Sequence, residues 1–158
     1  MIESAGQGGD SALRLNGARA EANEPAADPS AGLVISNVTK SWGERRVLRS
    51  VSLRVPPGVT AWVGGKNGVG KTTLLRIVAG LILAEEGDVK LDRLDPRLVM
   101  LDEPLNSLDE DGIALLCTAL ADLNSRGGAA IWCSPSPPEL HEITRLYELR
   151  DGLLEERR

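Results

Sequence analysis

Eight consecutive residues carry the strongest chemical signal in this sequence. Gly65 to Thr72 read Gly-Lys-Asn-Gly-Val-Gly-Lys-Thr, which is the pattern G-x-x-x-x-G-K-T of a phosphate-binding loop. The glycines let the chain curl so that backbone N–H groups, from about Gly68 to Thr73, point at one anion. The alternative is a glycine-rich turn that matches by accident. An apolar segment at 60–63 and a helical pattern at 72–79 argue against it.

The side chains of this phosphate loop have separate uses. Lys71 would place a mobile positive charge beside the β- and γ-phosphates of a nucleotide, and the Thr72 hydroxyl is a hard oxygen ligand for Mg²⁺. A nucleoside triphosphate with Mg²⁺ is therefore the expected ligand. We expect the nucleotide to contact Gly65, Asn67, Gly68, Gly70, Lys71, Thr72 and Thr73.

Two acidic residues follow an apolar segment later in the chain. Residues 98–101 form an uninterrupted apolar run, which predicts a strand buried on both faces, and Asp102 and Glu103 come next. A carboxylate at the C-terminal end of a parallel strand faces the crevice in which such sheets bind ligands. We expect Asp102 to hold Mg²⁺ through water opposite Thr72, and Glu103 to orient or deprotonate the attacking water, with Lys71 as its catalytic partner. The alternative is that the two acids only cap a strand.

The elements that must position these residues can also be read from the sequence. Strands alternating with helices imply right-handed crossovers, hence an α/β fold with a largely parallel sheet, helices on both faces and an antiparallel β flank. Strands are expected at 33–38, 51–55, 60–63, 87–91, 98–101, 129–133 and 146–149. Helices are expected at 72–79, from about 110 until Gly127, and at 139–145.

Size and charge narrow the possible classes of protein. A chain of 158 residues suits one domain with a real core, and a net charge of -5 gives no reason to expect a nucleic-acid partner. The longest apolar stretch, 77–84, is too short to span a membrane. Cys117 and Cys133 lie in apolar segments and are expected to be reduced, buried thiols. These features are typical of a cytoplasmic protein, free or peripheral on the inner face of the plasma membrane.

Taken together, the motifs resemble the nucleotide-binding domain of ABC transporters, a class of P-loop NTPase, and are most similar to small bacterial exporter ATPases of the haem-exporter type. Besides the phosphate loop and 98–104, residues 47–53, 106–109 (the family's D-loop) and 149–152 carry the resemblance. It implies an ATP-binding subunit that hydrolyses ATP to power transport and docks on membrane permease subunits. Residues 1–31 are then expected to be a disordered acidic tail, and 32–158 a truncated ABC-type domain.

The family position of one aromatic residue adds a further expectation. The resemblance assigns Trp42 to the side chain that stacks on adenine, and an indole offers the area and π surface for this. The alternative for Trp42 is a core or turn aromatic.

Several family features are missing from this chain. Lys71 and Asp102 lie only 31 positions apart, so the Q-loop glutamine, the helical subdomain and the LSGGQ signature have no room between them. Where the family has a histidine that contacts the γ-phosphate, this chain has Ser134 and Pro135, and His141 is expected to be a surface residue. Hydrolysis should therefore be slow.

These losses leave other functions open. The chain could be a non-hydrolysing regulatory partner of an intact ABC subunit, forming a heterodimer with it, or a degenerate inactive remnant. A small-molecule kinase is disfavoured, because no basic lid segment is present.

Overall fold

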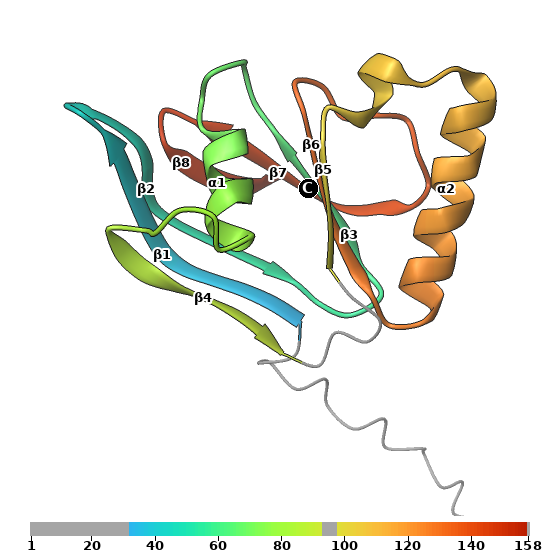
Figure 1. Ribbon diagram of the computed structural model, residues 1–158, viewed down its shortest axis with the longest axis horizontal. Helices are drawn as coiled ribbons and strands as arrows, with labels where there is room; N and C mark the ends of the chain where they lie inside the picture. The colour runs from blue at the N-terminus through green and yellow to red at the C-terminus, as the bar shows by residue number, and fades with distance from the viewer. Residues whose placement is uncertain (1–31, 93–97, 158) are drawn as a thin grey trace, which may run out of the picture.

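The computed structural model describes residues 32–92 and 98–157, which build two sheets and two α-helices (Figure 1). The expected tail, 1–31, lies outside the described residues. In chain order the elements are β1 (Gly32–Trp42), β2 (Arg45–Val55), β3 (Thr60–Gly64), α1 (Lys71–Val78), β4 (Glu86–Asp92), β5 (Leu98–Asp102), a 3-10 turn η1 (Pro104–Ser107), α2 (Glu110–Ser125), β6 (Ala129–Ser134), β7 (Ile143–Arg150) and β8 (Leu153–Arg157).

The central sheet has the strand order β5-β6-β3-β7-β8. Strands β5, β6, β3 and β7 run parallel, and only β8 is antiparallel, as a hairpin partner of β7. The largely parallel sheet expected from the sequence is therefore confirmed. In such a sheet the C-terminal ends of the strands meet at one edge, where ligands bind.

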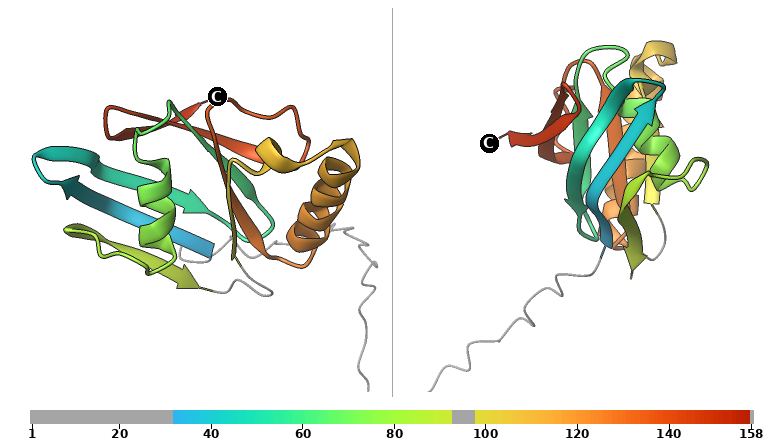
Figure 2. Two further views of the ribbon diagram at one scale, coloured as in Figure 1. Left: turned by 45° about the horizontal axis from the view of Figure 1, so that its top comes forward. Right: turned by 90° about the vertical axis from the view of Figure 1, so that its left-hand side faces the viewer.

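Strand β3 lies in the middle of this sheet, and all five of its residues are buried. Ala61 and Val63 belong to one apolar cluster and Trp62 to another, because successive side chains of a strand point to opposite faces. The first cluster contains the buried side of α1, and the second contains Leu120 of α2. The two helices therefore cover opposite faces of the central sheet, as expected (Figure 2).

The flank sheet is antiparallel, with the order β2-β1-β4. Leu33, Val38 and Leu48, which are buried in it, join the same apolar cluster as α1. Helix α1 is thus enclosed between the flank sheet and the central sheet, and it is held there by Leu74, which is fully buried. Because α1 begins at the end of the phosphate loop, this packing fixes the orientation of the helix N-terminus.

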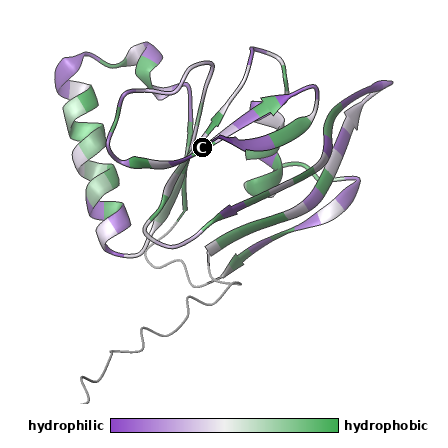
Figure 3. Ribbon diagram, turned by 180° about the vertical axis from the view of Figure 1, so that it is seen from behind, coloured by the Kyte–Doolittle hydropathy of each residue, from purple (hydrophilic) through white to green (hydrophobic). Residues whose placement is uncertain are grey.

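Helix α2 is less deeply packed than its sequence suggests. Ile113, Leu116, Leu120 and Leu123 recur at helical spacing along one face, but only Leu120 is fully buried, and Leu115 is 71% exposed. Figure 3 shows that the central turns of α2 are nevertheless apolar. Among the described residues, no helix has both the length and the hydropathy that crossing a bilayer requires.

The prediction that residues 98–101 form a strand buried on both faces is wrong in one respect. They do form β5, but β5 lies at the edge of the central sheet and its apolar side chains are only half-buried. Strand β4, which precedes it in the chain, is an edge strand of the flank sheet. Leu91, near the end of β4, is 57% exposed. Apolar side chains are therefore partly exposed to solvent on both β4 and β5, the two strands that border the short connection, between Lys71 and Asp102, where the family's helical subdomain is absent.

The expected helix at 139–145 is also wrong. The chain makes a turn there, and Ile143 already begins β7, which pairs with β3 along its length. Pairing with β3 outweighs the local helical preference, because it provides hydrogen bonds for the backbone N–H and C=O groups of both strands inside the sheet. His141 is exposed in this turn, as expected of a surface residue.

The two cysteines differ more than the sequence predicts. Cys133 is fully buried in β6, and this burial, with the nearby Asp102 carboxylate, raises the pKa of its thiol to about 12. Cys117 is only half-buried on α2, so the expectation of two buried thiols holds for Cys133 alone. Partial burial raises the pKa of Cys117 as well.

We predict that iodoacetamide at pH 8 modifies Cys117 well before Cys133 in the native chain. The thiolate is the reactive form, and a pKa of about 12 leaves about one Cys133 thiol in 10⁴ ionised at this pH. Peptide mapping by mass spectrometry measures both rates, and Cys117→Ser serves as control by removing the early label. Equal rates at the two cysteines would contradict the buried position of Cys133.

Candidate functional site

The phosphate loop connects the buried end of β3 to the start of α1. Gly65 has φ 139 and Gly70 has φ 124, which residues with side chains rarely adopt. A Cβ at Gly65 would overlap the Leu149 carbonyl oxygen, and one at Gly70 would lie 2.9 Å from the Val47 carbonyl oxygen. Glycine is therefore required at both ends, where the loop passes against β7 and β2. Helix α1 begins at Lys71, so its first N–H groups have no intrahelical partner and are available to an anion.

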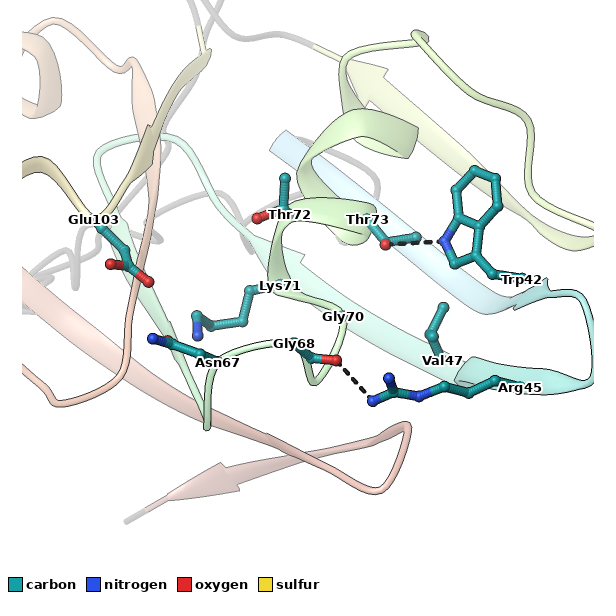
Figure 4. A pocket seen from close by; sticks show the side chains of 10 residues that line it. All are labelled: Trp42, Arg45, Val47, Asn67, Gly68, Gly70, Lys71, Thr72, Thr73 and Glu103. Atoms are coloured by element: carbon teal, nitrogen blue, oxygen red, sulfur yellow. Dashed lines mark hydrogen bonds between the residues drawn. The ribbon is translucent and has the colours of Figure 1, made fainter.

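Lys71 is 95% shielded from solvent, and its ammonium group bonds within the loop. Its Nζ donates to the carbonyl oxygens of Gly65, at 2.7 Å, and of Lys66, at 3.3 Å. These contacts compensate the buried charge, and no carboxylate of the described residues forms an ion pair with it, so a phosphate could take the place of the carbonyl oxygens. Figure 4 shows Lys71 pointing toward the end of the pocket where Asn67 and Glu103 lie.

The two expected metal-binding residues meet directly. The Thr72 hydroxyl donates to Oδ2 of Asp102 at 2.8 Å, which joins the start of α1 to the C-terminal end of β5. Asp102 pairs in register with Cys133 of β6, so the strand pairing sets its position. A hydroxyl and a carboxylate oxygen are ligands that Mg²⁺ prefers, and a bound phosphate could complete the site. The residues present therefore fit a Mg²⁺-nucleotide complex.

Glu103 has a strained backbone, with φ 49 and ψ 48 in the left-handed region. Its N–H donates to the Cys133 carbonyl oxygen at 2.7 Å, which stabilises this conformation. Its side chain accepts a hydrogen bond from Asn106 Nδ2 at 2.8 Å, within the segment that resembles the family's D-loop. The strained turn directs Glu103 into the pocket instead of leaving it as a cap of β5, and Asn106 limits its movement.

Trp42 lies at the tip of the hairpin formed by β1 and β2 and is 50% exposed, so it is not a core residue. Its Nε1 donates to the Thr73 hydroxyl at 3.3 Å, which ties the indole to α1. The Lys40 ammonium lies 5.3 Å from the ring centroid. Glu85, whose pKa is lowered by a hydrogen bond from the Ser41 N–H, anchors this end of β1. The indole is thus held in place with much of its surface open, as stacking on a base requires.

These residues line one pocket of about 270 Å³. In Figure 4, Lys71, Asn67 and Glu103 lie at one end, and Trp42 and Arg45 lie at the other. Thr72, Thr73, Gly68 and Gly70 line the space between them. The pocket lining therefore includes the expected residues except Gly65 and Asp102, and a hydrogen bond from Thr72 joins Asp102 to it. Arg45 was not expected from the sequence, although the hairpin register opposite Trp42 could have indicated it.

Ser134 is the last residue of β6, and the family resemblance would place a histidine there. Its hydroxyl accepts a hydrogen bond from Trp62 Nε1 at 2.8 Å and donates to the Ser136 carbonyl oxygen at 2.6 Å. Its single proton is therefore already used, and it does not act as a free donor toward a phosphate. The Trp62 ring also fills the space beside Gly64, where a Cβ would overlap it. Trp62 and Ser134 thus support the strand end from which the phosphate loop begins.

A buried strand, this loop, a helix that starts at the loop's lysine, and a threonine–aspartate pair on neighbouring elements define a P-loop NTPase fold. Residues 48–99 match the model of the ABC transporter family. The chain is 43% identical over 90 residues to the aliphatic sulfonates import ATP-binding protein SsuB of Rhodopseudomonas palustris. The match covers 53% of this chain and 32% of that protein, so the chain spans about a third of this relative's length.

Solved structures with a similar fold include proteins from ABC transporters. The ADP conformation of MJ1267, an ATP-binding cassette of an ABC transporter, has a TM-score of 0.70 at 15% identity and covers 78% of this chain and 89% of that one. CbiO1 from Clostridium perfringens, part of the transporter complex cbiONQ, has a TM-score of 0.67 at 12% identity and covers 80% and 87%. At such low sequence identity, these structural matches show a similar fold and nothing more. In its motifs and its fold the chain is similar to the ATP-binding proteins of ABC transporters. The expected likeness to haem exporters in particular stays a prediction.

We predict that Gly65→Ala lowers the free energy of unfolding by about 2–5 kcal/mol, because the new methyl group meets backbone at a left-handed φ. Gly68→Ala is the matched control. Gly68 has φ 75 but nothing lies within 4 Å of a Cβ there, so only the backbone cost of about 1–2 kcal/mol remains. Urea denaturation measures both variants. Equal losses would show that Leu149 does not confine the loop.

Proposed function

We propose that this chain is an ABC-type subunit that binds Mg·ATP in the pocket between Trp42 and Glu103. The observation that carries the proposal is the Thr72–Asp102 hydrogen bond of 2.8 Å beside the phosphate loop, because it pairs the metal ligands where the phosphates would lie. In this complex Lys71 would leave the loop carbonyls for the β- and γ-phosphates. Trp42 would cover the base. The nucleotide would bring in the Mg²⁺, which stabilises charge on the phosphates.

We further propose that this chain hydrolyses ATP slowly. The sequence contains no LSGGQ segment, so neither this chain nor a second copy of it can supply the donors that complete the family's active site. Ser134 has its only proton committed to Ser136, and Asn106 occupies one oxygen of Glu103. Loss of a single preorganised donor commonly lowers a rate by about 10²- to 10³-fold. Glu103 remains the group that would orient or deprotonate water.

The partners are proposed from the same observations. An intact ABC subunit could supply the missing signature to this chain's phosphate loop, which would make the chain a regulatory half of a heterodimer. Membrane permease subunits are the partner class of the family. The block by which the family docks on them is the one missing between β4 and β5. Hydrolysis coupled to transport would then depend on the intact subunit.

We expect Lys71→Ala to weaken Mg·ATP binding by at least about 100-fold, because it removes the buried charge that faces the phosphates. Lys66→Ala is the matched control. This exposed loop lysine does not line the pocket and should change affinity less than about twofold. Isothermal titration calorimetry measures all three proteins, with thermal unfolding as a test of folding. Unchanged affinity in Lys71→Ala would sink the proposed function.

Glu103→Gln should leave the Mg·ATP affinity within about threefold of the wild type and remove the residual phosphate release. Glutamine keeps the shape and an oxygen that can accept from Asn106, but it cannot take a proton from water. Single-turnover phosphate release with enzyme in excess is the measurement, with an intact ABC ATPase run in parallel. Wild-type turnover equal to that of the intact enzyme would refute slow hydrolysis. Turnover in Glu103→Gln equal to that of the wild type would exclude Glu103 as the catalytic carboxylate.

A further inference from the structure

Arg45 lines the nucleotide pocket, yet the function proposed above gives it no role. It is the first residue of β2, and its side chain reaches the phosphate loop. Its Nη2 donates to the Gly68 carbonyl oxygen at 2.9 Å (Figure 4). The guanidinium of this exposed arginine therefore lies at the rim of an anion-binding loop, where it could contact a bound ligand.

The hairpin register explains why Arg45 faces the pocket. Trp42 and Arg45 are directly paired across the two-residue turn between β1 and β2. Paired residues of antiparallel strands present their side chains on the same face, so the turn that presents the indole also presents the guanidinium. Val47, two residues further on, lines the same pocket. Arg46 lies between them in the sequence and is not part of this lining.

No carboxylate in the part of the chain that the structure describes compensates the charge of Arg45. Within residues 32–92 and 98–157, no ion pair joins Arg45 to an acidic side chain, and its one hydrogen bond uses a single donor. A guanidinium carries five N–H donors in a planar fork, so further donors remain available for an acceptor in the pocket. The neighbouring N–H groups of the phosphate loop select an anion, and a phosphate oxygen suits the fork geometrically.

We propose that Arg45 is a second cationic contact for the phosphate chain of a bound nucleoside di- or triphosphate. The residue keeps its hydrogen bond to Gly68 while another N–H of the guanidinium donates to a phosphate oxygen. Arg45 would thus act from the side of the pocket opposite Lys71 and would help to retain the nucleotide. This inference rests on the proposed function and deepens it.

The test compares Arg45→Gln with Arg46→Gln. Both variants remove one exposed positive charge from adjacent positions, but only Arg45 lines the pocket. Calorimetry with Mg·ATP and Mg·ADP, and competition by adenosine, gives the affinities. We expect Arg45→Gln to weaken ATP and ADP binding by about five- to tenfold, the range for a charge-assisted contact at an exposed site. Adenosine, which has no phosphate, should change by less than about twofold, as should all three ligands with Arg46→Gln.

Two outcomes would overturn the inference while leaving the proposed function intact. Equal affinities of Arg45→Gln and Arg46→Gln would show that position 45 has no special contact. Equal weakening of adenosine and ATP would show that Arg45 supports the hairpin and Trp42 instead of binding phosphate. A lower thermal midpoint in Arg45→Gln calls for Arg45→Lys, which retains the charge and should recover most of the lost ATP affinity. Absence of any nucleotide binding by the wild type would instead refute the proposed function, and this inference with it.

Discussion

The position of strand β3 is the constraint on which the rest of this structure depends. Its five residues are all buried, with parallel partners on both sides, and its apolar side chains, Ala61, Trp62 and Val63, alternate between two apolar clusters. Burying a tryptophan such as Trp62 removes about 150–250 Å² from water, worth about 4–6 kcal/mol. Because β3 is held from both faces and both edges, the phosphate loop starts from a rigid point. Loops that bind phosphate need this support, since their own backbone is strained.

The candidate site combines three separately held parts. The phosphate loop leads into α1, which is confined between the two sheets. Asp102 and Glu103 lie at the C-terminal end of β5, whose pairing with β6 holds them in place. Trp42 and Arg45 belong to a hairpin of the flank sheet. Short contacts connect the parts: Thr72 with Asp102, Trp42 with Thr73, and Arg45 with Gly68. Each contact joins residues that are at least 23 positions apart in the chain. The site is consequently a product of the fold and not of one motif.

Much of this arrangement could be predicted from the sequence, and the failures have physical causes. The phosphate loop and β3 were predictable because glycine spacing and a short apolar run leave few alternatives. The helix expected at 139–145 was wrong because local preference cannot account for pairing with a buried strand. The edge position of β5 was missed because an apolar run indicates that a strand is hydrophobic but does not indicate how many strands pair with it. Arg45 was missed because its role depends on a hairpin register that periodicity alone does not define.

The short interval between β4 and β5 has a consequence for how such a chain can change in length. The two strands are consecutive in the sequence, yet they form the edges of two different sheets (Figure 1). A segment added or removed between them leaves every strand pair of both sheets in register. The main thermodynamic cost is loop closure, which rises by only about 0.6 kcal/mol for each doubling of length. A whole subdomain can therefore be inserted or removed between β4 and β5 while both sheets keep their strand order.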